Sequence, residues 1–479
     1  MPRTGMTLQR WCFAGAVLCY ALAAWFGVGY YGEDEFQHVI LLAEHLRGHV
    51  DLASLPLDYH QGWRGMLLPA MAASVFSVLE FCGIHDPFTL TFFLRLVTGG
   101  FALGTMRSFT RALHDHVKPE STAPLLVLTS SLWFLPLLLV RFNGEAWSAL
   151  FFLRGTTQLL STDRSKWFAG VWLAAATICR PAVALLAAAA LVWSLSRGTL
   201  NRKHLLTLLV AGATTLASGV LLDSVIHGYF TLTLWNYGTA VLTGEEAARF
   251  TELPWYQYVL FTLKYLTLPI GALVLAAFGT LLVLRPTHVL VWLIVPFLLV
   301  HSILPVKEVR FLFPLAPLIP WLLIAAKEAM DDRWPGLFRN IVWHLAFVGV
   351  VLVNMLALMV GLATPAGNGR IALAQTIANR AHGQAVHIDH AGDWRQWIPP
   401  FFLPPGSTER FVKTLEADQG TRPHYLIARE GAPAMDVRSL RLIEAASPAW
   451  THRVLGLYGL EDGHVPLVLY EVRSNGPQH

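Results

Sequence analysis

The feature that most constrains this chain is a series of apolar runs long enough to cross a membrane. The first of them, WCFAGAVLCYALAAWFGVGY at residues 11–30, contains no charged residue, and a spanning helix needs about 20 such residues. Further apolar segments follow at residues 65–82, 89–106, 123–140, 146–160, 167–195, 205–225, 257–284, 289–304, 311–326 and 340–363. We therefore predict a polytopic α-helical membrane protein with about eleven transmembrane helices.

Composition supports this fold class and argues against others. Of the 479 residues, 54% are hydrophobic and 14% charged, and the mean hydropathy of +0.49 lies outside the usual range of soluble proteins. The net charge of +4 is carried by short loops rather than by a basic tract, so we expect no nucleic-acid partner. The four cysteines form no CxxC pair and the 19 histidines no HExxH pattern. We therefore expect neither a metal site nor a cofactor.

The distribution of Lys and Arg predicts which loops face which side of the bilayer. Loops rich in these residues are expected in the cytoplasm, and they lie at residues 107–118, 161–166, 194–203 and 327–340. The outer side then receives the loops 31–64, 226–256 and 305–310 and the chain after residue 363. Two crossings stay open, because the pair at 65–106 is one too many and the run 167–195 reads either as one long helix or as two short ones broken at CRPA.

The outer side gathers polar residues that apolar packing does not explain. The first apolar run leads directly into Glu33, Asp34 and Glu35, and the apolar positions of residues 34–47 have the spacing of an amphipathic helix at the membrane interface. An ionisable group at the centre of a spanning helix costs roughly 2.5–3.5 kcal/mol, so such groups usually face a cavity or one another. Further polar residues in or beside apolar segments are Arg141, Asn143, Glu145, Arg180, Asp223, Lys307, Glu308 and Arg310.

Each of these charges also has a simpler interpretation. Charges at helix ends can snorkel to the interface, and Arg180 beside Pro181 could merely line a kink. Unrelated solvated charges would be spread over both sides of the membrane, however. Their convergence on one side favours a shared site.

The order of motifs along the chain resembles glycosyltransferase family 22, the mannosyltransferases that build GPI anchors and dolichol-linked oligosaccharides and have the GT-C fold. The segment GEDEFQ (32–37) is similar to the family's H-P-D-E-x-F/W-Q, and HSILPVKEVRFLFPLAPLI (301–319) to its H-S-x-x-x-H-K-E-x-R-F-x-x-P-x-x-P. Between them, in family order, lie YHQGWRGMLLP (59–69), VRFNGEAW (140–147), CRPA (179–182), LLDSVIHGYFTLTLWNY (221–237) and LPWYQYV (253–259). The chain departs from the family at Val306, where the family has His, and at Glu33, where it has Pro.

Transfer of a sugar from a lipid phosphate to an alcohol needs a base for the hydroxyl proton and cations for the leaving phosphate. Asp34 or Glu35 supplies the base. Because neighbouring residues on a helix point about 100° apart, we expect Asp34 to act as base and Glu35 to position the acceptor or the loop. The cations expected at the donor phosphate are Lys307, Arg310, Arg180 and Arg141. The residues expected to bind or orient the substrates are Gln37, Asn143, Glu145, Asp223, Trp255 and Glu308.

The resemblance implies a mannosyltransferase that moves mannose from a β-linked polyprenyl-phosphate donor to a glycan or glycolipid acceptor with inversion. We expect a multi-pass protein of the bacterial inner membrane, or of the ER membrane in a eukaryote, with its site facing the periplasm or the lumen. One alternative is another GT-C transferase that uses a different lipid-linked sugar. The alternative from another class is a transporter or flippase, but transporters tend to have two repeated halves, and this sequence shows no internal repeat.

The sequence divides into two predicted domains. Residues 1–363 form the GT-C transmembrane domain, and residues 364–479 form a small α/β domain on the outer side. In the second domain we expect a helix at 368–381 and strands at AVHIDH (385–390), HYLIARE (424–430), THRVLGLYGL (451–460) and VPLVLYEVR (465–473). The segment DWRQW (393–397) is expected to rest at the membrane surface or on a sugar.

Overall fold

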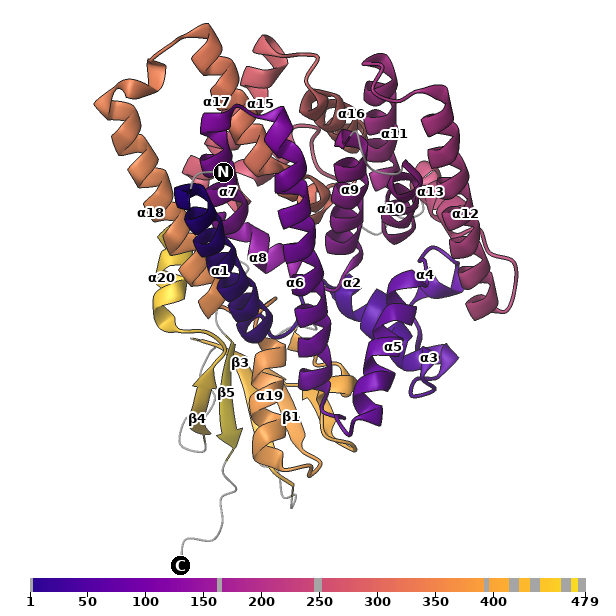
Figure 1. Ribbon diagram of the computed structural model, residues 1–479. Coiled ribbons are helices and arrows are strands. Elements are labelled where there is room, and N and C mark those ends of the chain that lie inside the picture. The colour runs from indigo at the N-terminus through magenta and orange to yellow at the C-terminus, as the bar shows by residue number, and fades with distance from the viewer. Residues whose placement is uncertain are drawn as a thin grey trace, which may run out of the picture. The chain divides into compact units, whose positions relative to one another are not determined.

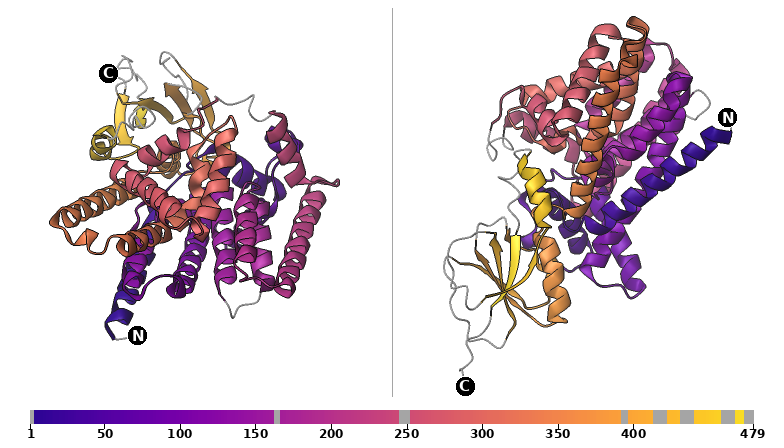
Figure 2. Two further views of the ribbon diagram at one scale, coloured as in Figure 1. Left: turned by 90° about the horizontal axis from the view of Figure 1, so that it is seen from above. Right: turned by 90° about the vertical axis from the view of Figure 1, so that its left-hand side faces the viewer.

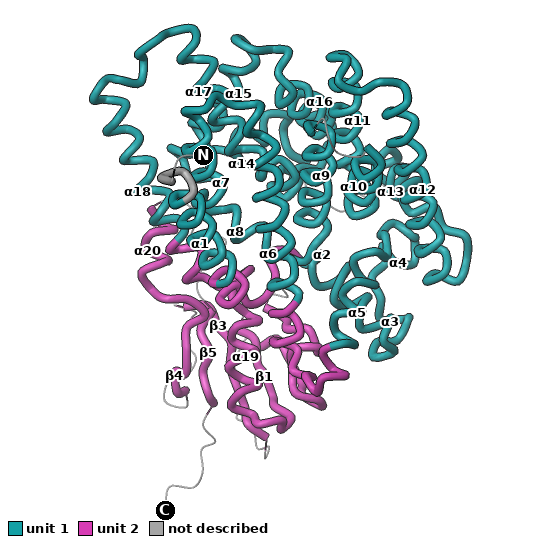
Figure 3. Tube along the Cα trace, in the orientation of Figure 1, with its two compact units in different colours: residues 1–21, 33–78, 94–358 teal, residues 22–32, 79–93, 359–479 magenta. Residues whose placement is uncertain are grey.

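The computed structural model describes residues 3–161, 166–244, 252–391, 396–412, 422–430, 440–457 and 467–472, with only the backbone of residues 3–6. The chain forms two compact units, coloured separately in Figure 3. The first consists of residues 1–21, 33–78 and 94–358, and the second of residues 22–32, 79–93 and 359–479. The domain boundary expected between residues 363 and 364 stays a prediction.

Helices dominate the chain up to residue 363, and each of the apolar segments in the sequence falls on helical structure (Figure 1). The helices are α1 (Arg3–Phe26), α2 (Glu33–Glu35), α3 (Leu41–Leu46), α4 (Leu57–His60), α5 (Leu67–Phe81), α6 (Pro87–Ala112), α7 (Thr122–Ser131), α8 (Phe134–Leu139), α9 (Gly144–Leu160), α10 (Lys166–Cys179), α11 (Val183–Ser196), α12 (Arg202–His227), α13 (Thr233–Thr243), α14 (Gln257–Tyr265), α15 (Leu268–Leu284), α16 (Val289–Ile303), α17 (Ile319–Arg333) and α18 (Ile341–Ala363). The run 167–195 is therefore two helices, separated at Arg180 and Pro181, where proline removes a backbone donor and restricts the residue before it.

The length and composition of these helices are those of a protein that crosses the membrane several times. Among the described residues, four stretches are long and apolar enough to span by themselves, namely Pro87–His116, Arg202–His227, Val309–Arg333 and Ile341–Ala363. A bent pair, α15 with α16, could form a fifth span. Only 17% of the most apolar stretch of α12 and of α18 is buried, against 67% for Val309–Arg333. Helices α12 and α18 therefore have the surface of lipid-facing helices, whereas Val309–Arg333 belongs to the core. The number of eleven crossings stays a prediction.

Helix α10 packs closely against both α9 and α12 in the first unit (Figure 1). A methyl group at Gly170 would lie 2.2 Å from the carbonyl oxygen of Leu208 on α12, so only glycine permits this approach. Small residues at helix contacts are the usual device for bringing helices together where lipid gives no hydrophobic drive. This packing brings the end of α10 and the beginning of α9 together at one edge of the unit.

The segment expected to be an amphipathic helix is helical from Glu33 to Leu46, but one turn, Phe36–Ile40, is a π-helix between α2 and α3. Such turns are rare and occur often at functional sites. Its apolar face is buried as the spacing predicted, with Phe36 4% and Val39 3% exposed. A further buried cluster of Leu42, Leu55, Tyr59 and Met66 joins α3 to the following loop, which fixes the loop against the helix.

The second unit is built on a five-stranded mixed sheet in the order β2-β1-β3-β5-β4. The strands are β1 (His387–Ala391), β2 (Thr408–Phe411), β3 (His424–Arg429), β4 (Leu440–Ala445) and β5 (Leu467–Val472). Strand β1 pairs in parallel with β2 and β3, and β5 pairs antiparallel with β3 and β4. Helix α19 (Arg370–Ala381) lies along one face of the sheet (Figure 2), where Thr376 donates a hydrogen bond to Glu444 at 2.6 Å. The expected small α/β fold is confirmed.

One expected strand of this unit is wrong. Residues 451–457 belong to helix α20 (Ala449–Leu457) and not to a strand. The helix begins directly after Ser447 and Pro448, and a serine followed by proline is a helix-start signal that the apolar residues further on do not reveal. Strands β2 and β4 were not expected, and residues 393–395 of the segment DWRQW lie outside the described residues. Of the rest of that segment, Gln396 is buried and Trp397 is 41% exposed.

Candidate active site

A cavity opens among the helices of the first unit beside α2. Its volume is about 890 Å³ with its open mouth included. The polar side chains of its wall are those of Asp34, His38, Arg64, Asn143, Glu145, Arg180, Asp223, Thr233 and Tyr237, and its apolar ones include Leu67, Ile178, Leu216, Val220 and Leu234. A few charged groups on a mostly apolar wall are the composition of a site that binds and orients an amphiphilic ligand.

Asp34 brings a carboxylate to this cavity from α2. Arg310 pairs with its Oδ2 atom, and Nδ1 of His38, four residues further on, lies 3.7 Å from the same oxygen. The contact of each of these two partners is therefore with Oδ2. Burial alone would raise the pKa of the Asp34 carboxyl, but His38 and the charge of Arg310 outweigh it and hold that pKa well below its usual range. Asp34 is therefore an ionised carboxylate at neutral pH on the wall of the cavity.

His38 links Asp34 to a second carboxylate. Its Nε2 atom lies 3.3 Å from Oδ2 of Asp58, and Arg64 donates to that same oxygen from Nε at 3.0 Å and approaches it with Nη2 at 2.9 Å. Burial and Arg64 lower the pKa of His38, but its two carboxylate partners raise it further, so the net shift is upward. Burial would raise the pKa of Asp58, whereas His38 and Arg64 lower it to about 2.

Sequence reasoning missed His38 and Asp58 as site residues. A usable signal existed for His38, because a residue four positions after Asp34 lies on the same face of a helix. Arg64 stands inside a matched motif, YHQGWRGMLLP, but was not singled out there. For Asp58 the sequence offers no comparable signal, since its approach to His38 depends on the path of the intervening loop.

Glu35 occupies a different environment from Asp34. Its side chain is buried and does not line the cavity. Its Oε1 atom lies 3.8 Å from Nη1 of Arg141, which is 2% exposed and also absent from the cavity wall. The two adjacent carboxylates thus lie in different places, one at the cavity and one inside the protein. Their roles as base and positioning residue stay a prediction.

The arginines near the cavity surround one aromatic ring. Arg180 lines the cavity and pairs with Glu145, and its Cζ atom lies 5.0 Å from the ring centre of Phe311. Arg310 pairs with Glu308 as well as with Asp34, and its Cζ lies 5.9 Å from the same ring. One guanidinium group thus pairs with Asp34 and the other shares its cavity wall. Arg180 has one carboxylate partner and Arg310 has two, and each guanidinium carries five N–H donors.

Helix α9 begins at this cavity because of two neighbouring residues. The side chain of Asn143 accepts a hydrogen bond from the backbone N–H of Ala146 at 2.9 Å, which caps the helix. A methyl group at Gly144 would lie 2.9 Å from the carbonyl oxygen of Cys179, so glycine is required for α9 to approach the end of α10. This approach positions Glu145 against Arg180. Asn143 and Glu145 thus shape the site as well as line it.

Lys307 is not brought to the cavity wall. Its ammonium group donates to the carbonyl oxygens of Leu253 at 2.9 Å and Leu304 at 2.5 Å, and burial lowers its pKa. The backbone N–H of Leu253 also donates to Pro305 at 3.1 Å. Lys307 thus ties the loop before Arg310 to the segment that precedes α14.

The other expected site residues differ in their surroundings. Asp223 lines the cavity and accepts hydrogen bonds from the backbone of Met66 at 2.8 Å and from Thr233 at 2.6 Å, so it joins α12 to α13 and to the start of α5. Trp255 is 72% exposed. Gln37 is half-buried in the π-helical turn and is not part of the cavity wall.

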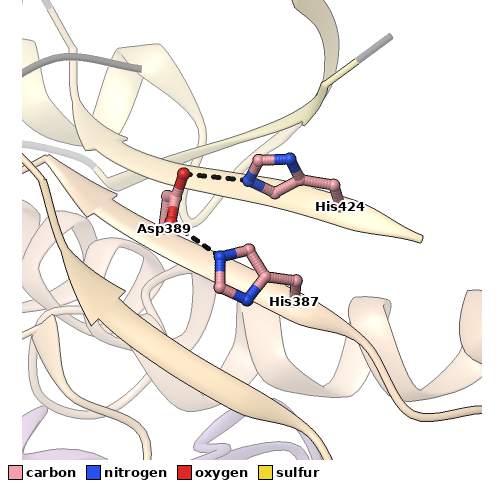
Figure 4. Close-up of side chains that lie close together, drawn as sticks. All are labelled: His387, Asp389 and His424. Atoms are coloured by element: carbon pink, nitrogen blue, oxygen red, sulfur yellow. Dashed lines mark hydrogen bonds and ion pairs between the residues drawn. The ribbon is translucent and has the colours of Figure 1, made fainter. Parts of the chain in front are cut away.

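A second cluster of titratable side chains lies on the sheet of the other unit (Figure 4). The buried carboxylate of Asp389 is bonded by Nε2 of His387 at 3.1 Å and Nε2 of His424 at 2.9 Å. Arg410 donates to it from Nε at 2.5 Å and from Nη2 at 3.1 Å. Burial would raise the pKa of Asp389, but His424 and Arg410 hold it below its usual range.

This cluster contains the residues that could hold a metal ion. One ligand atom each from His387, Asp389 and His424 lies within 4.8 Å of the others, and two imidazoles with a carboxylate suit zinc. Arg410, however, donates to both oxygens of Asp389, and a guanidinium there opposes a cation. Both oxygens of Asp389 already accept hydrogen bonds within the protein.

Comparison with known proteins finds a family that covers most of the chain. A family model described as the Alg9-like mannosyltransferase family matches residues 12–393. GPI mannosyltransferase 3 of Yarrowia lipolytica is 26% identical to the chain over 314 residues, which are 63% of this chain and 58% of that protein. The match thus covers a little over half the length of that curated relative.

Two solved structures resemble the whole chain. ArnT from Cupriavidus metallidurans bound to undecaprenyl phosphate has a TM-score of 0.53 at 12% identity, and the match covers 99% of this chain and 100% of that chain. The same protein in the apo state has a TM-score of 0.50 at 13% identity, with both chains fully covered. At these identities the likeness concerns the fold, and the polytopic helical GT-C fold expected from the sequence is confirmed.

Proposed function

The chain belongs to the Alg9-like mannosyltransferase family, and from this premise we propose that it transfers mannose from a polyprenyl-phosphate donor to a hydroxyl of a glycan or glycolipid. The observation that carries the proposal is the cavity of the first unit, whose wall includes the ionised Asp34 and Arg180, with Arg310 paired to Asp34. A base and cations within one cavity are what this transfer needs.

Arg180 and Arg310 bind the donor phosphate in this proposal. Guanidinium groups recognise phosphate through paired N–H donors, and Arg180 lies on the cavity wall while Arg310 lies beside it on Asp34. The negative charge of the leaving phosphate grows as the glycosidic bond breaks, so these contacts strengthen in the transition state. The resemblance of the fold to ArnT, whose structure holds undecaprenyl phosphate, supports a lipid phosphate as the leaving group. We assign Lys307 to holding the loop that carries Arg310.

Asp34 acts as the base through its Oδ1 atom. Arg310 and His38 both approach Oδ2, so we assign the other oxygen to the substrate hydroxyl. Arg310 keeps the carboxylate ionised until the acceptor hydroxyl becomes acidic, which happens as its oxygen bonds to the sugar. Glu35 holds the helix in place through Arg141.

The reaction is a single displacement with inversion. Of the other carboxylates on the cavity wall, Glu145 is paired with Arg180, and Asp223 accepts two hydrogen bonds within the protein. No second carboxylate of the described wall is thus left to form a covalent intermediate with the sugar, as a double displacement requires. We place the site on the outer face of the bacterial inner membrane, or on the lumenal face of the ER membrane in a eukaryote. An alternative within the same fold is transfer of a different lipid-linked sugar.

A donor panel tests this proposal. The full chain in lipid nanodiscs is given octyl α-mannoside as acceptor and, one at a time, labelled polyprenyl phosphates of mannose, glucose, N-acetylglucosamine and arabinose, with GDP-mannose as the soluble control. We expect label in the acceptor from polyprenyl-phosphate mannose alone. Transfer from GDP-mannose would remove the lipid phosphate from the proposal, and transfer from another lipid-linked sugar would remove mannose. Absence of transfer from every donor would contradict the activity.

A further inference from the structure

The function of His38 goes beyond the reaction as stated so far. We propose that His38 is the proton exit of this site, taking from Asp34 the proton that the acceptor hydroxyl loses and releasing it toward solvent. The inference rests on the proposed function. Asp58 and Arg64 are positioning residues in this scheme, because Asp58 faces His38 and Arg64 holds Asp58.

The proton balance of the reaction requires such an exit. The donor is a phosphodiester with one negative charge, and the product lipid phosphate is a monoester whose second pKa is about 6. At neutral pH the leaving group therefore departs largely as a dianion. The C–O bond to phosphate breaks with its electron pair on phosphate, the acceptor O–H bond breaks, and its proton goes to Asp34. One proton per turnover must then leave a carboxylate whose low pKa does not retain it.

The geometry gives that proton a receiver. Nδ1 of His38 lies 3.7 Å from Oδ2 of Asp34, and Nε2 lies 3.3 Å from Asp58. The first distance is longer than a hydrogen bond, and contacts of catalytic groups commonly shorten when substrate binds. Once the protonated carboxyl group of Asp34 turns so that its O–H faces Nδ1, the proton passes to the ring. The ring then releases its other proton from Nε2 toward Asp58. The two nitrogens of one imidazole thus connect the reacting carboxylate to a second carboxylate outside the reaction.

Asp58 and Arg64 hold the ring in this orientation. Arg64 reaches Asp58 with two nitrogens at 3.0 and 2.9 Å, and its Cζ lies 5.4 Å from the ring centre of Tyr237 on α13. The side chains of His38 and Asp58 are 12% and 15% exposed, so the relay is shielded but not sealed from water. Proton release to solvent therefore remains open at Asp58.

The charge state of His38 depends on groups from several elements. The ring is faced by Asp34 from its own helix, by Asp58 from α4 and by Arg64 from the following loop. The other titratable or charged side chains of the cavity wall are Glu145, Cys179, Arg180, Asp223 and Tyr237, and Arg310 acts through Asp34. The two carboxylates shift the pKa of His38 upward. Since only a neutral ring can accept the proton, the rate should rise with pH through that raised pKa.

Steady-state transfer against pH tests the proposal. For His38→Ala we expect kcat to fall by about 10²-fold, the lower end of what a positioned proton-transfer group contributes, with loss of the rising limb of the pH profile. Free imidazole should restore part of the rate in His38→Ala and should not change the wild-type rate. His60→Gln, an exposed histidine of the same loop, is the matched control and should keep both the rate and the limb. An unchanged limb in a folded His38→Ala enzyme would overturn the proposal.

A second readout does not depend on turnover. The Cε1–H resonance of His38, assigned by its absence in His38→Gln, reports the titration of the ring in nanodiscs. We expect a pKa above the ordinary histidine value in the wild type and a lower one in Asp58→Asn. An equal pKa in both proteins would remove Asp58 from the relay. If the rising limb of the pH profile is found with a lipid-linked sugar other than mannose, the proposed substrate is contradicted but the relay is supported. Failure of the proposed function is thus distinguishable from failure of the relay.

Discussion

Asp34 in the first unit and Asp389 in the second are both carboxylates held by histidine and arginine. They differ in the exposure of the carboxylate and in which of its oxygens the partners contact. Arg310 and His38 approach one oxygen of Asp34, which is 26% exposed at the cavity. His387, His424 and Arg410 together contact both oxygens of Asp389, which is not exposed at all. The same side-chain types thus make a reaction site in one place and a structural network in the other. The difference lies in whether one carboxylate oxygen faces a cavity.

The Asp389 network joins three strands of the sheet. Asp389 lies on β1 directly opposite Arg410 on β2, and His424 comes from β3 on the other side. A buried carboxylate is costly unless it is paired and hydrogen-bonded, and these contacts satisfy it. We therefore expect the network to stabilise the second unit without taking part in transfer.

Removal of the charge of Asp34 should have the largest effect on the transfer rate. Asp34→Asn keeps the size of the side chain but loses the base, so we expect kcat to fall by about 10²–10⁴-fold with little change in thermal unfolding. Glu35→Gln is the matched variant, because it removes a negative charge that faces Arg141 inside the protein. Glu35→Gln should lower the unfolding temperature and change the rate per folded molecule only a little. A normal rate in Asp34→Asn together with an inactive, folded Glu35→Gln would reverse the two roles.

The reciprocal change at Asp389 should act on stability. Asp389→Asn removes the charge that pairs with Arg410 and the two histidines, and loss of one partner of a buried ion pair costs about 3–5 kcal/mol. We expect earlier thermal unfolding of the second unit and a normal transfer rate for the protein that remains folded. Activity loss in a fully folded Asp389→Asn enzyme would show that the sheet takes part in the reaction. Limited proteolysis of the C-terminal unit is the readout that separates the two outcomes.

Arg310 and Lys307 are two nearby cations of the first unit for which we expect different roles. Arg310→Gln removes a donor to the leaving phosphate, and loss of one such group costs about 10²–10³-fold in kcat. Lys307→Gln removes a cation three residues away that contacts backbone carbonyls, so its main effect should be on thermal stability. Kinetics of both variants with saturating donor decide the assignment. A drop in kcat for folded Lys307→Gln equal to that of Arg310→Gln would return Lys307 to the donor site.

Acid should affect the second unit through Asp389 with a defined sign. Because the folded pKa of Asp389 lies below its unfolded value, its contribution to stability is present above the unfolded pKa of about 3.9 and is lost as pH falls through the folded one. At pH values below about 4, the unfolding temperature of the second unit should therefore decrease in the wild type. In Asp389→Asn this dependence should be weaker. Parallel acid curves for the two proteins would show that Asp389 does not carry the effect.

The helical framework could be predicted from the sequence because apolar length is a local property. The break between α10 and α11 follows from Pro181, and strands β1, β3 and β5 follow from short apolar runs. The short strands β2 and β4 have few buried residues, so their pattern carries little signal. Helix α20 was lost for the opposite reason, since its residues form an apolar run and only Pro448 before it indicates a helix.

The candidate site could be predicted in part. Resemblance placed Asp34, Arg180 and Arg310 in one family pattern, and the structure brings them together around one cavity edge. It does not bring Lys307 there, because backbone carbonyls compete for an ammonium group and no sequence pattern reports that competition. The approach of His38 to Asp58, twenty residues further on, likewise depends on the tertiary path of a loop.

The anomeric configuration of the product tests most directly the claim that Asp34 alone drives a single displacement in this cavity. Purified enzyme is given β-linked polyprenyl-phosphate mannose and octyl α-mannoside, and the one-bond carbon–hydrogen coupling at the new anomeric centre is read by NMR. For a single displacement we expect an α-linked mannose and no labelled protein after rapid acid quench. A β-linked product, or a mannosylated side chain trapped on the enzyme, would require a second displacement and would contradict it.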